Sequence, residues 1–131
     1  MIVEGDEVAR FVSEAIGFGL CPPFVAIGIK RDGAIVAGVI LNCFEGHDVH
    51  VTAAGHGWTR GYLRALGEYI FDGLGCLRAT ITTEQDHVAV LANKLGAQEE
   101  GRLRDHFGKD RDGIVMGVLK DEYRFRARPF P

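Results

Sequence analysis

The sequence predicts a single α/β domain, residues 1–131, built on a mixed sheet with three main helices. Three apolar runs follow one another with turn-forming residues between them, which is typical of an antiparallel meander. Farther along, a helical pattern separates two apolar runs, which is typical of a parallel strand–helix–strand crossover. A sheet that contains both kinds of strand pairing follows from these two observations.

The first half of the chain reads as one helix followed by three strands. Residues 6–16 carry apolar side chains at helical spacing, and the segment "GFGLCPP" then ends the helix. The turn signals Asp32-Gly33 and Glu45-Gly46 separate the apolar runs that follow. The three predicted strands cover residues 24–30, 34–44 and 47–54.

The second half returns to helical spacing after residue 58. Gly73 and Gly75 are suited to end this helix, and Thr82 and Gln85 have the spacing of a capping box for the next one. That next helix is expected to stop at Gly96. The remaining predicted elements are strands at 76–83, 97–107 and 114–120, and a loose basic tail at 124–131.

Composition excludes several classes of protein. The chain is 47% hydrophobic and 25% charged, so it can bury a core, and its net charge of −3 argues against a general nucleic-acid binder. No apolar run is long enough to cross a bilayer, and the acidic start "MIVEGDEVAR" is unlike a signal peptide, so we expect a cytoplasmic protein. Cys21, Cys43 and Cys76 lack metal-type or redox-type spacing, and we expect buried, reduced thiols.

The stretch "VTAAGHGWTRGYLRAL" reads as a strand, a glycine-containing turn and a helix. Backbone N–H groups at a helix N-terminus favour an anion such as a pyrophosphate, and Gly57 and Gly61 allow close approach to the backbone. Thr59 and Arg60 add a hydroxyl and a cation near the helix start. An ordinary connection with a solvent-facing arginine is the alternative. Trp58 either contacts a ligand or packs partly into the core.

The segment "TTEQDHVAVLANKLGAQEEGRLRDHF", residues 82–107, carries a family resemblance. Its K-L-G-A at 94–97, its E-G at 100–101 and Arg104 resemble the GNAT superfamily of N-acetyltransferases, closest to the ribosomal-protein N-terminal acetyltransferase type. The family also has R/Q-x-x-G-x-G/A after its fourth strand. Aligned on the following helix, Ala54, Gly57 and Thr59 occupy the three signature positions, so only the first glycine is kept. The resemblance covers about residues 24–123.

The resemblance implies a GNAT-like fold and transfer of acetyl from acetyl-CoA to an amine. The acceptor is then a protein N-terminus, an aminoacyl group or a small amine. Val51, Thr52 and Ala53 become the strand segment that receives the pantetheine arm and supplies the oxyanion donor, and Gln85 becomes a partner for a cofactor amide. No metal is implied. Relatives often dimerise and open sheet edges need cover, so a homodimer is a further expectation.

The general base is not obvious, because residues 47–56 contain no glutamate. Strand alternation places Asp48, His50 and Thr52 on one face of the sheet. Histidine titrates near neutral pH, so we assign His50, with Asp48, as the candidate catalytic pair; an ordinary polar strand face is the alternative. His47 and His50 lie on opposite faces and do not form a metal pair.

The general acids that the family uses are also replaced. Ala92 occupies the position of the usual tyrosine, and Val88 that of the serine in the N-terminal acetyltransferase type. Cys43, Tyr62 and Tyr69 are other possible proton donors. Two hypotheses follow: an N-acetyltransferase, or a catalytically impaired GNAT-like module that binds acyl-CoA, another small ligand or a partner protein.

Overall fold

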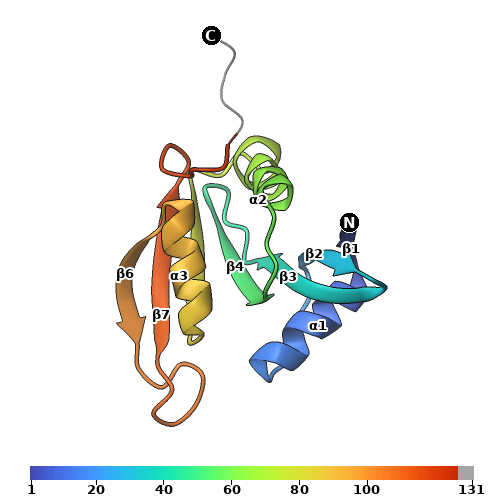
Figure 1. Ribbon diagram of the computed structural model, residues 1–131. Helices are drawn as coiled ribbons and strands as arrows, with labels where there is room; N and C mark the ends of the chain where they lie inside the picture. Colours follow the sequence, from blue (N-terminus) through green and yellow to red (C-terminus); the bar gives the residue numbers. More distant parts are fainter. Residues whose placement is uncertain (127–131) are drawn as a thin grey trace.

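The computed structural model describes residues 1–126 (Figure 1). A seven-stranded sheet forms its centre, in the order β1-β2-β3-β4-β5-β7-β6. The strands are β1 (Ile2–Glu4), β2 (Val25–Arg31), β3 (Ala34–Asn42), β4 (Asp48–Gly55), β5 (Arg78–Thr83), β6 (Gln98–Leu103) and β7 (Gly113–Leu119). The helices are α1 (Asp6–Ile16), α2 (Arg60–Gly67), its π-helical continuation η1 (Glu68–Gly73), and α3 (Asp86–Leu95).

The predicted mixed sheet is confirmed. Strands β2, β3 and β4 form the antiparallel meander, and β4 and β5 are the parallel pair on either side of α2. The additional strand β1 pairs with β2 and was not predicted, because three residues are too few to show an alternating pattern. The π-helical end of the second helix was not predicted either.

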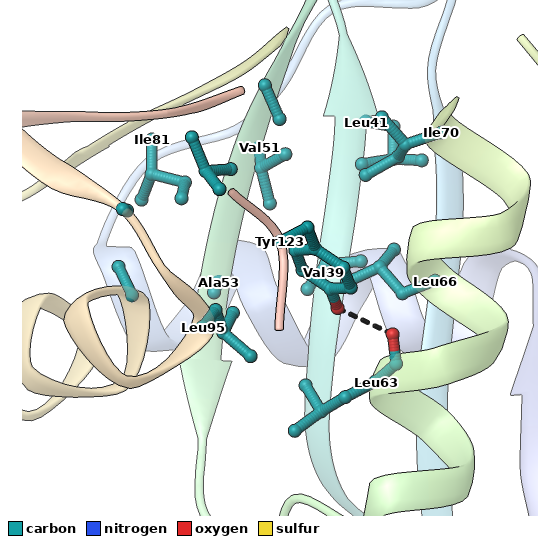
Figure 2. Close-up of a cluster of buried hydrophobic side chains, with 14 of the residues drawn as sticks. Val39, Leu41, Val51, Ala53, Leu63, Leu66, Ile70, Ile81, Leu95 and Tyr123 are labelled. Atoms are coloured by element: carbon teal, nitrogen blue, oxygen red, sulfur yellow. Dashed lines mark hydrogen bonds between the residues drawn. The ribbon is translucent and has the colours of Figure 1, made fainter. Parts of the chain in front are cut away.

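The helices cover the two faces of the sheet unequally. On one face, α1 packs through Val8 and Val12 on Ile40 and Ala54. On the other face, α2, η1 and α3 bury a larger cluster against β2–β5 and β7. Figure 2 shows this cluster, with Leu63, Leu66 and Ile70 of the α2–η1 helix and Leu95 of α3 facing the sheet. Such burial stabilises each large side chain by about 1.5–3 kcal/mol.

Two buried tyrosines fix the second helix in place. The Tyr62 hydroxyl donates to the Ile27 carbonyl oxygen at 2.6 Å, and that of Tyr123 donates to the Leu63 carbonyl oxygen at 2.5 Å (Figure 2). Burial raises the pKa of both phenols, because the ionised form would lose its hydration. Both side chains therefore stay neutral and act as hydrogen-bond donors.

The chain after β7 is more ordered than the sequence predicts. The Arg124 amide donates to the Leu95 carbonyl oxygen at 2.9 Å, and Arg126 pairs with Asp72 at 2.8 Å. Residues 124–126 are therefore held against α3 and η1 rather than loose. The rest of the predicted loose tail, 127–131, lies outside the described residues.

Two local predictions are wrong. The capping box fails because β5 runs to Thr83, whose hydroxyl, rather than that of Thr82, accepts the Gln85 amide at 3.0 Å. The thiols are free, but only Cys76 is buried, whereas the other two, at positions 21 and 43, lie in exposed loops. Within residues 1–126, no helix has the length and apolarity that a membrane span needs.

Candidate active site between β4 and β5

The two parallel strands separate before they end. Their pairing runs from Asp48 opposite Arg78 to Val51 opposite Ile81, yet β4 continues to Gly55 and β5 to Thr83. Each strand keeps its other neighbour to the end: β4 stays paired with β3 through Gly55, and β5 with β7 through Thr83. The final residues of β4 and β5 therefore diverge and leave a gap in the sheet.

Glycine holds the end of β4 against β3. Gly55 has a φ of 94°, and a Cβ there would overlap the carbonyl oxygen of Val36. The next amide, that of His56, donates to the same oxygen at 3.0 Å. A side chain at Gly55 would push β4 away from β3. Because residue 55 is glycine, β4 stays paired with β3 to its end, and it separates only from β5.

Ala53 presents its backbone to the gap. Its carbonyl oxygen accepts the side-chain amide of Gln85, the N-cap residue of α3, at 3.0 Å. The N–H and C=O of one strand residue point to the same side, so the Ala53 N–H also faces β5, beyond the last paired residue. Two residues of the predicted site, Ala53 and Gln85, therefore lie in contact, and one backbone group of Ala53 is already hydrogen-bonded.

The loop after β4 leads into a helix start with available amides. Thr59 caps α2, and its hydroxyl accepts the Tyr62 amide at 3.1 Å. The first amides of a helix have no intrahelical acceptor, and those of Arg60 and Gly61 have no backbone acceptor elsewhere in residues 1–126. Gly57, with a φ of 88°, turns the chain just before them. This arrangement suits an anion.

An arginine that sequence reasoning missed contacts this loop. Arg31, at the end of β2, donates from Nη2 to the Gly57 carbonyl oxygen at 2.9 Å. It lies 26 residues earlier in the chain, so only the sheet brings the two together. Ala54, which aligns with the arginine or glutamine of the family, is fully buried under α1 and has no room for a long side chain. Arg31 and the exposed Arg60 are the cations beside the loop.

Trp58 is half-buried and packs on the larger core cluster. Its ring lies 5.4 Å from that of Tyr62, in a tilted arrangement. Packing accounts for its position, and the structure leaves part of the indole exposed beside the loop.

The predicted catalytic pair lies on the expected face but outside the gap. Asp48 accepts the Thr80 hydroxyl at 2.8 and 2.9 Å and is 3.7 Å from the Arg78 guanidinium. His50 is exposed and sits opposite Asn42 in the sheet. Neither side chain lines the cavity described next, and their catalytic role stays a prediction.

A small cavity lies at the gap, on the face that α1 covers. Its wall includes Thr52 and Ala53 of β4, Glu84 and Gln85 after β5, and Phe107 of the β6–β7 loop. Ala15 and Ile16 at the end of α1, with Thr82 and Thr83, complete the lining. Of these residues, only Thr52, Ala53 and Gln85 belong to the predicted site.

Glu84 is the one ionisable side chain in that lining. Its carboxylate accepts from Nε of Arg111 at 3.0 Å and also from Nη2, in a two-point ion pair. The guanidinium of Arg111 lowers the pKa of Glu84. Sequence reasoning missed Glu84 because it searched for the base on the fourth strand alone. Its position directly after the apolar run of β5 was the available signal.

The alternative proton donors are not at the gap. The Tyr62 hydroxyl is bonded to Ile27 inside the core. Cys43 and Tyr69 line a separate apolar pocket around Val49, at the other end of β4. Residues 1–126 contain no cluster of three or more His, Cys, Asp or Glu side chains able to hold a metal ion.

No protein-family model and no curated protein matches the sequence. Solved structures match in fold. A dodecameric spermidine N-acetyltransferase from Vibrio cholerae has a TM-score of 0.70 at 13% identity, over 95% of each chain. Aminoglycoside 6'-acetyltransferase type Ii has a TM-score of 0.65 at 15% identity, over 98% of this chain and 99% of that one.

The solved structures that match in fold also include an enzyme of the ribosomal-protein N-terminal acetyltransferase type. Ribosomal-protein-S5-alanine acetyltransferase from Vibrio fischeri has a TM-score of 0.58 at 18% identity, over 77% of this chain and 63% of that one. At such low identities, these similarities show a shared architecture and nothing more specific. The chain has the fold of the GNAT N-acetyltransferases.

Proposed function

We propose that the protein transfers an acetyl group from acetyl-CoA to an amine. The observation that carries this proposal is the gap between β4 and β5, which opens beside a glycine loop and a helix start with available amides. A small cavity at the gap lies beside the Ala53 backbone, and it would have to widen for donor and acceptor to meet there. The fold likeness supports the same activity, because the similar structures are N-acetyltransferases or acetyltransferases by name.

The acyl donor would bind along β4 and the following loop. Its pyrophosphate would take the amides near Gly57–Gly61, with Arg31 and Arg60 supplying positive charge. Its pantetheine arm would lie along Val51–Ala53, in the gap that β5 leaves open. An amide N–H of that arm would then compete with Gln85 for the Ala53 carbonyl oxygen.

The backbone would stabilise the charge that develops in the reaction. As the amine attacks the thioester, negative charge builds on the carbonyl oxygen, and a fixed N–H donor lowers the barrier. The Ala53 N–H faces the gap and is the donor that we assign to this role. Neither Val88 nor Ala92 can protonate the leaving thiolate, since both are apolar and buried, so solvent would supply that proton.

The acceptor stays open within the class of amines. The similar structures are named for spermidine, aminoglycoside and ribosomal-protein alanine acetylation, which are chemically different acceptors. Shared fold does not choose among them. We further propose a homodimer, since β6 is an edge strand whose six residues are all exposed. Light scattering coupled to gel filtration measures this directly.

Calorimetric titration with acetyl-CoA tests the proposal, with pantetheine and free coenzyme A as comparison ligands. We expect acetyl-CoA and coenzyme A to bind and to raise the melting temperature, and pantetheine to bind more weakly because it lacks the pyrophosphate. No heat and no thermal shift at millimolar acetyl-CoA would show that the gap is not a donor site.

A binding module without turnover is the second candidate. It is favoured by the replacement of the usual acids by Ala92 and Val88, and by the Gln85 contact that spans the gap. Release of free thiol from acetyl-CoA in the presence of mixed primary amines separates the two. Binding without thiol release across the amines would support the module.

A further inference from the structure

Glu84 is placed where an acceptor amine would have to arrive. It follows β5 directly and lines the cavity together with Thr52 and Ala53 of β4. The Ala53 backbone is the donor group assigned above, so Glu84 and the proposed reacting carbonyl share one small cavity. A carboxylate is a suitable partner for an ammonium group.

The rest of the lining is uncharged. Ala15 and Ile16 are apolar, and Phe107 stands 6.1 Å from Phe18, ring centre to ring centre. The lining also includes the hydroxyl and amide side chains of Thr52, Thr82, Thr83 and Gln85. The face of an aromatic ring attracts a cation. The cavity therefore combines one carboxylate with an uncharged lining that includes an aromatic ring, which favours an ammonium group.

Arg111 is the resting partner of that carboxylate. Within residues 1–126, it is the only side chain that forms an ion pair with Glu84. The Phe107 amide donates to the Arg111 carbonyl oxygen at 3.0 Å, so the ion pair also holds the loop that carries Phe107. Arg111 is more than half exposed and can move into solvent when another cation takes its place.

We propose that Glu84 binds the acceptor ammonium in exchange for Arg111 and accepts its proton. This inference rests on the proposed acetyl transfer and names the acceptor class as primary ammonium compounds. Loss of the guanidinium and exclusion of water by the acceptor both raise the pKa of Glu84, which makes it a better proton acceptor at the moment of reaction.

The acceptor ammonium passes one proton to the Glu84 carboxylate, and the freed nitrogen lone pair forms a bond to the thioester carbonyl carbon. The C–S bond then breaks, and its electron pair leaves with sulfur as the thiolate. After the attack the nitrogen still carries two hydrogens. It loses one of them to the thiolate through solvent and keeps the other as the amide hydrogen. Glu84 then returns its own proton to water.

The pair of variants Glu84→Gln and Arg111→Gln tests this role, because both remove the same ion pair. Thiol release from acetyl-CoA is followed from pH 3.5 to pH 9, with spermidine and with a peptide that has an N-terminal alanine as acceptor probes. We expect Glu84→Gln to lower acceptor kcat/KM by at least about 100-fold. Arg111→Gln should keep most of that value at pH 8 and should move the acidic limb of the profile to higher pH, because the pKa of Glu84 is no longer lowered.

The outcomes separate the two proposals. Equal losses in both variants, with equal falls in melting temperature, would show that the ion pair only holds the loop and would overturn the role of Glu84. Full activity in Glu84→Gln together with loss in His50→Ala would assign the base to the fourth strand instead. A wild-type protein that binds acetyl-CoA but releases no thiol with either probe would refute acetyl transfer to these amines, and with it this role.

Discussion

Gly57 is the position where one methyl group should disturb both stability and donor binding. Its φ of 88° lies in the left-handed region, which costs an L-residue about 1–2 kcal/mol. The added Cβ of Gly57→Ala would also lie 2.5 Å from Nη1 of Arg31, so the guanidinium must move away. The hydrogen bond from Arg31 to the Gly57 carbonyl oxygen would then be lost, and exposed bonds of this kind contribute about 0.5 kcal/mol.

The expected loss is about 2 kcal/mol in the free energy of unfolding. The entropy of unfolding is about 2.1 cal/mol/K per residue, so in a chain of 131 residues each kcal/mol shifts Tm by about 4 °C. Gly57→Ala should therefore melt about 7 °C below wild type in differential scanning calorimetry. Gly101→Ala is the matched control, because a Cβ at that strand position meets no atom within 4 Å and its φ is ordinary.

The affinity for acetyl-CoA should also depend on the conformation of this loop. Displacement of Arg31 and of the backbone around Gly57 should weaken the binding of acetyl-CoA by about 10-fold, because one lost charge-assisted contact is worth about 1.5 kcal/mol. Gly101→Ala should bind acetyl-CoA as wild type does. A Gly57→Ala protein that melts within 1–2 °C of wild type and binds acetyl-CoA equally well would refute this account of the loop.

Three further predictions concern the loop cation and the buried phenols. In calorimetric titrations, Arg31→Gln should weaken the binding of acetyl-CoA by about 10-fold at low salt and by less at 1 M salt. Tyr62→Phe should lower stability by about 1–2 kcal/mol in urea unfolding, because the Ile27 carbonyl loses its buried donor while the ring packing remains. The free energy of unfolding should begin to fall as pH rises above about 10, since unfolded tyrosines ionise at their ordinary pKa. Folded Tyr62 and Tyr123 resist ionisation because burial raises their pKa, and Tyr123→Phe should make that decline shallower.

Local sequence patterns account for what could be predicted of the fold. Three apolar runs separated by turn signals within residues 24–54 predicted the antiparallel meander, and the change to helical spacing after residue 58 predicted the crossover. Both patterns arise from the burial of side chains within one short stretch of chain, so a single segment is enough to show each of them. Two ordered segments were not predicted. Strand β1 is too short to show a pattern, and residues 124–126 are held by long-range contacts to Leu95 and Asp72.

The sequence by itself determined the mixed sheet, the glycine turn before α2, and the shared face of Asp48, His50 and Thr52. The tertiary structure decided that β4 and β5 separate after Val51, because that depends on which neighbour each strand keeps. It also brought Arg31 to Gly57 and Glu84 to the cavity beside Ala53. Those contacts join segments far apart in the chain, and their geometry is set by strand register and loop path rather than by any local pattern.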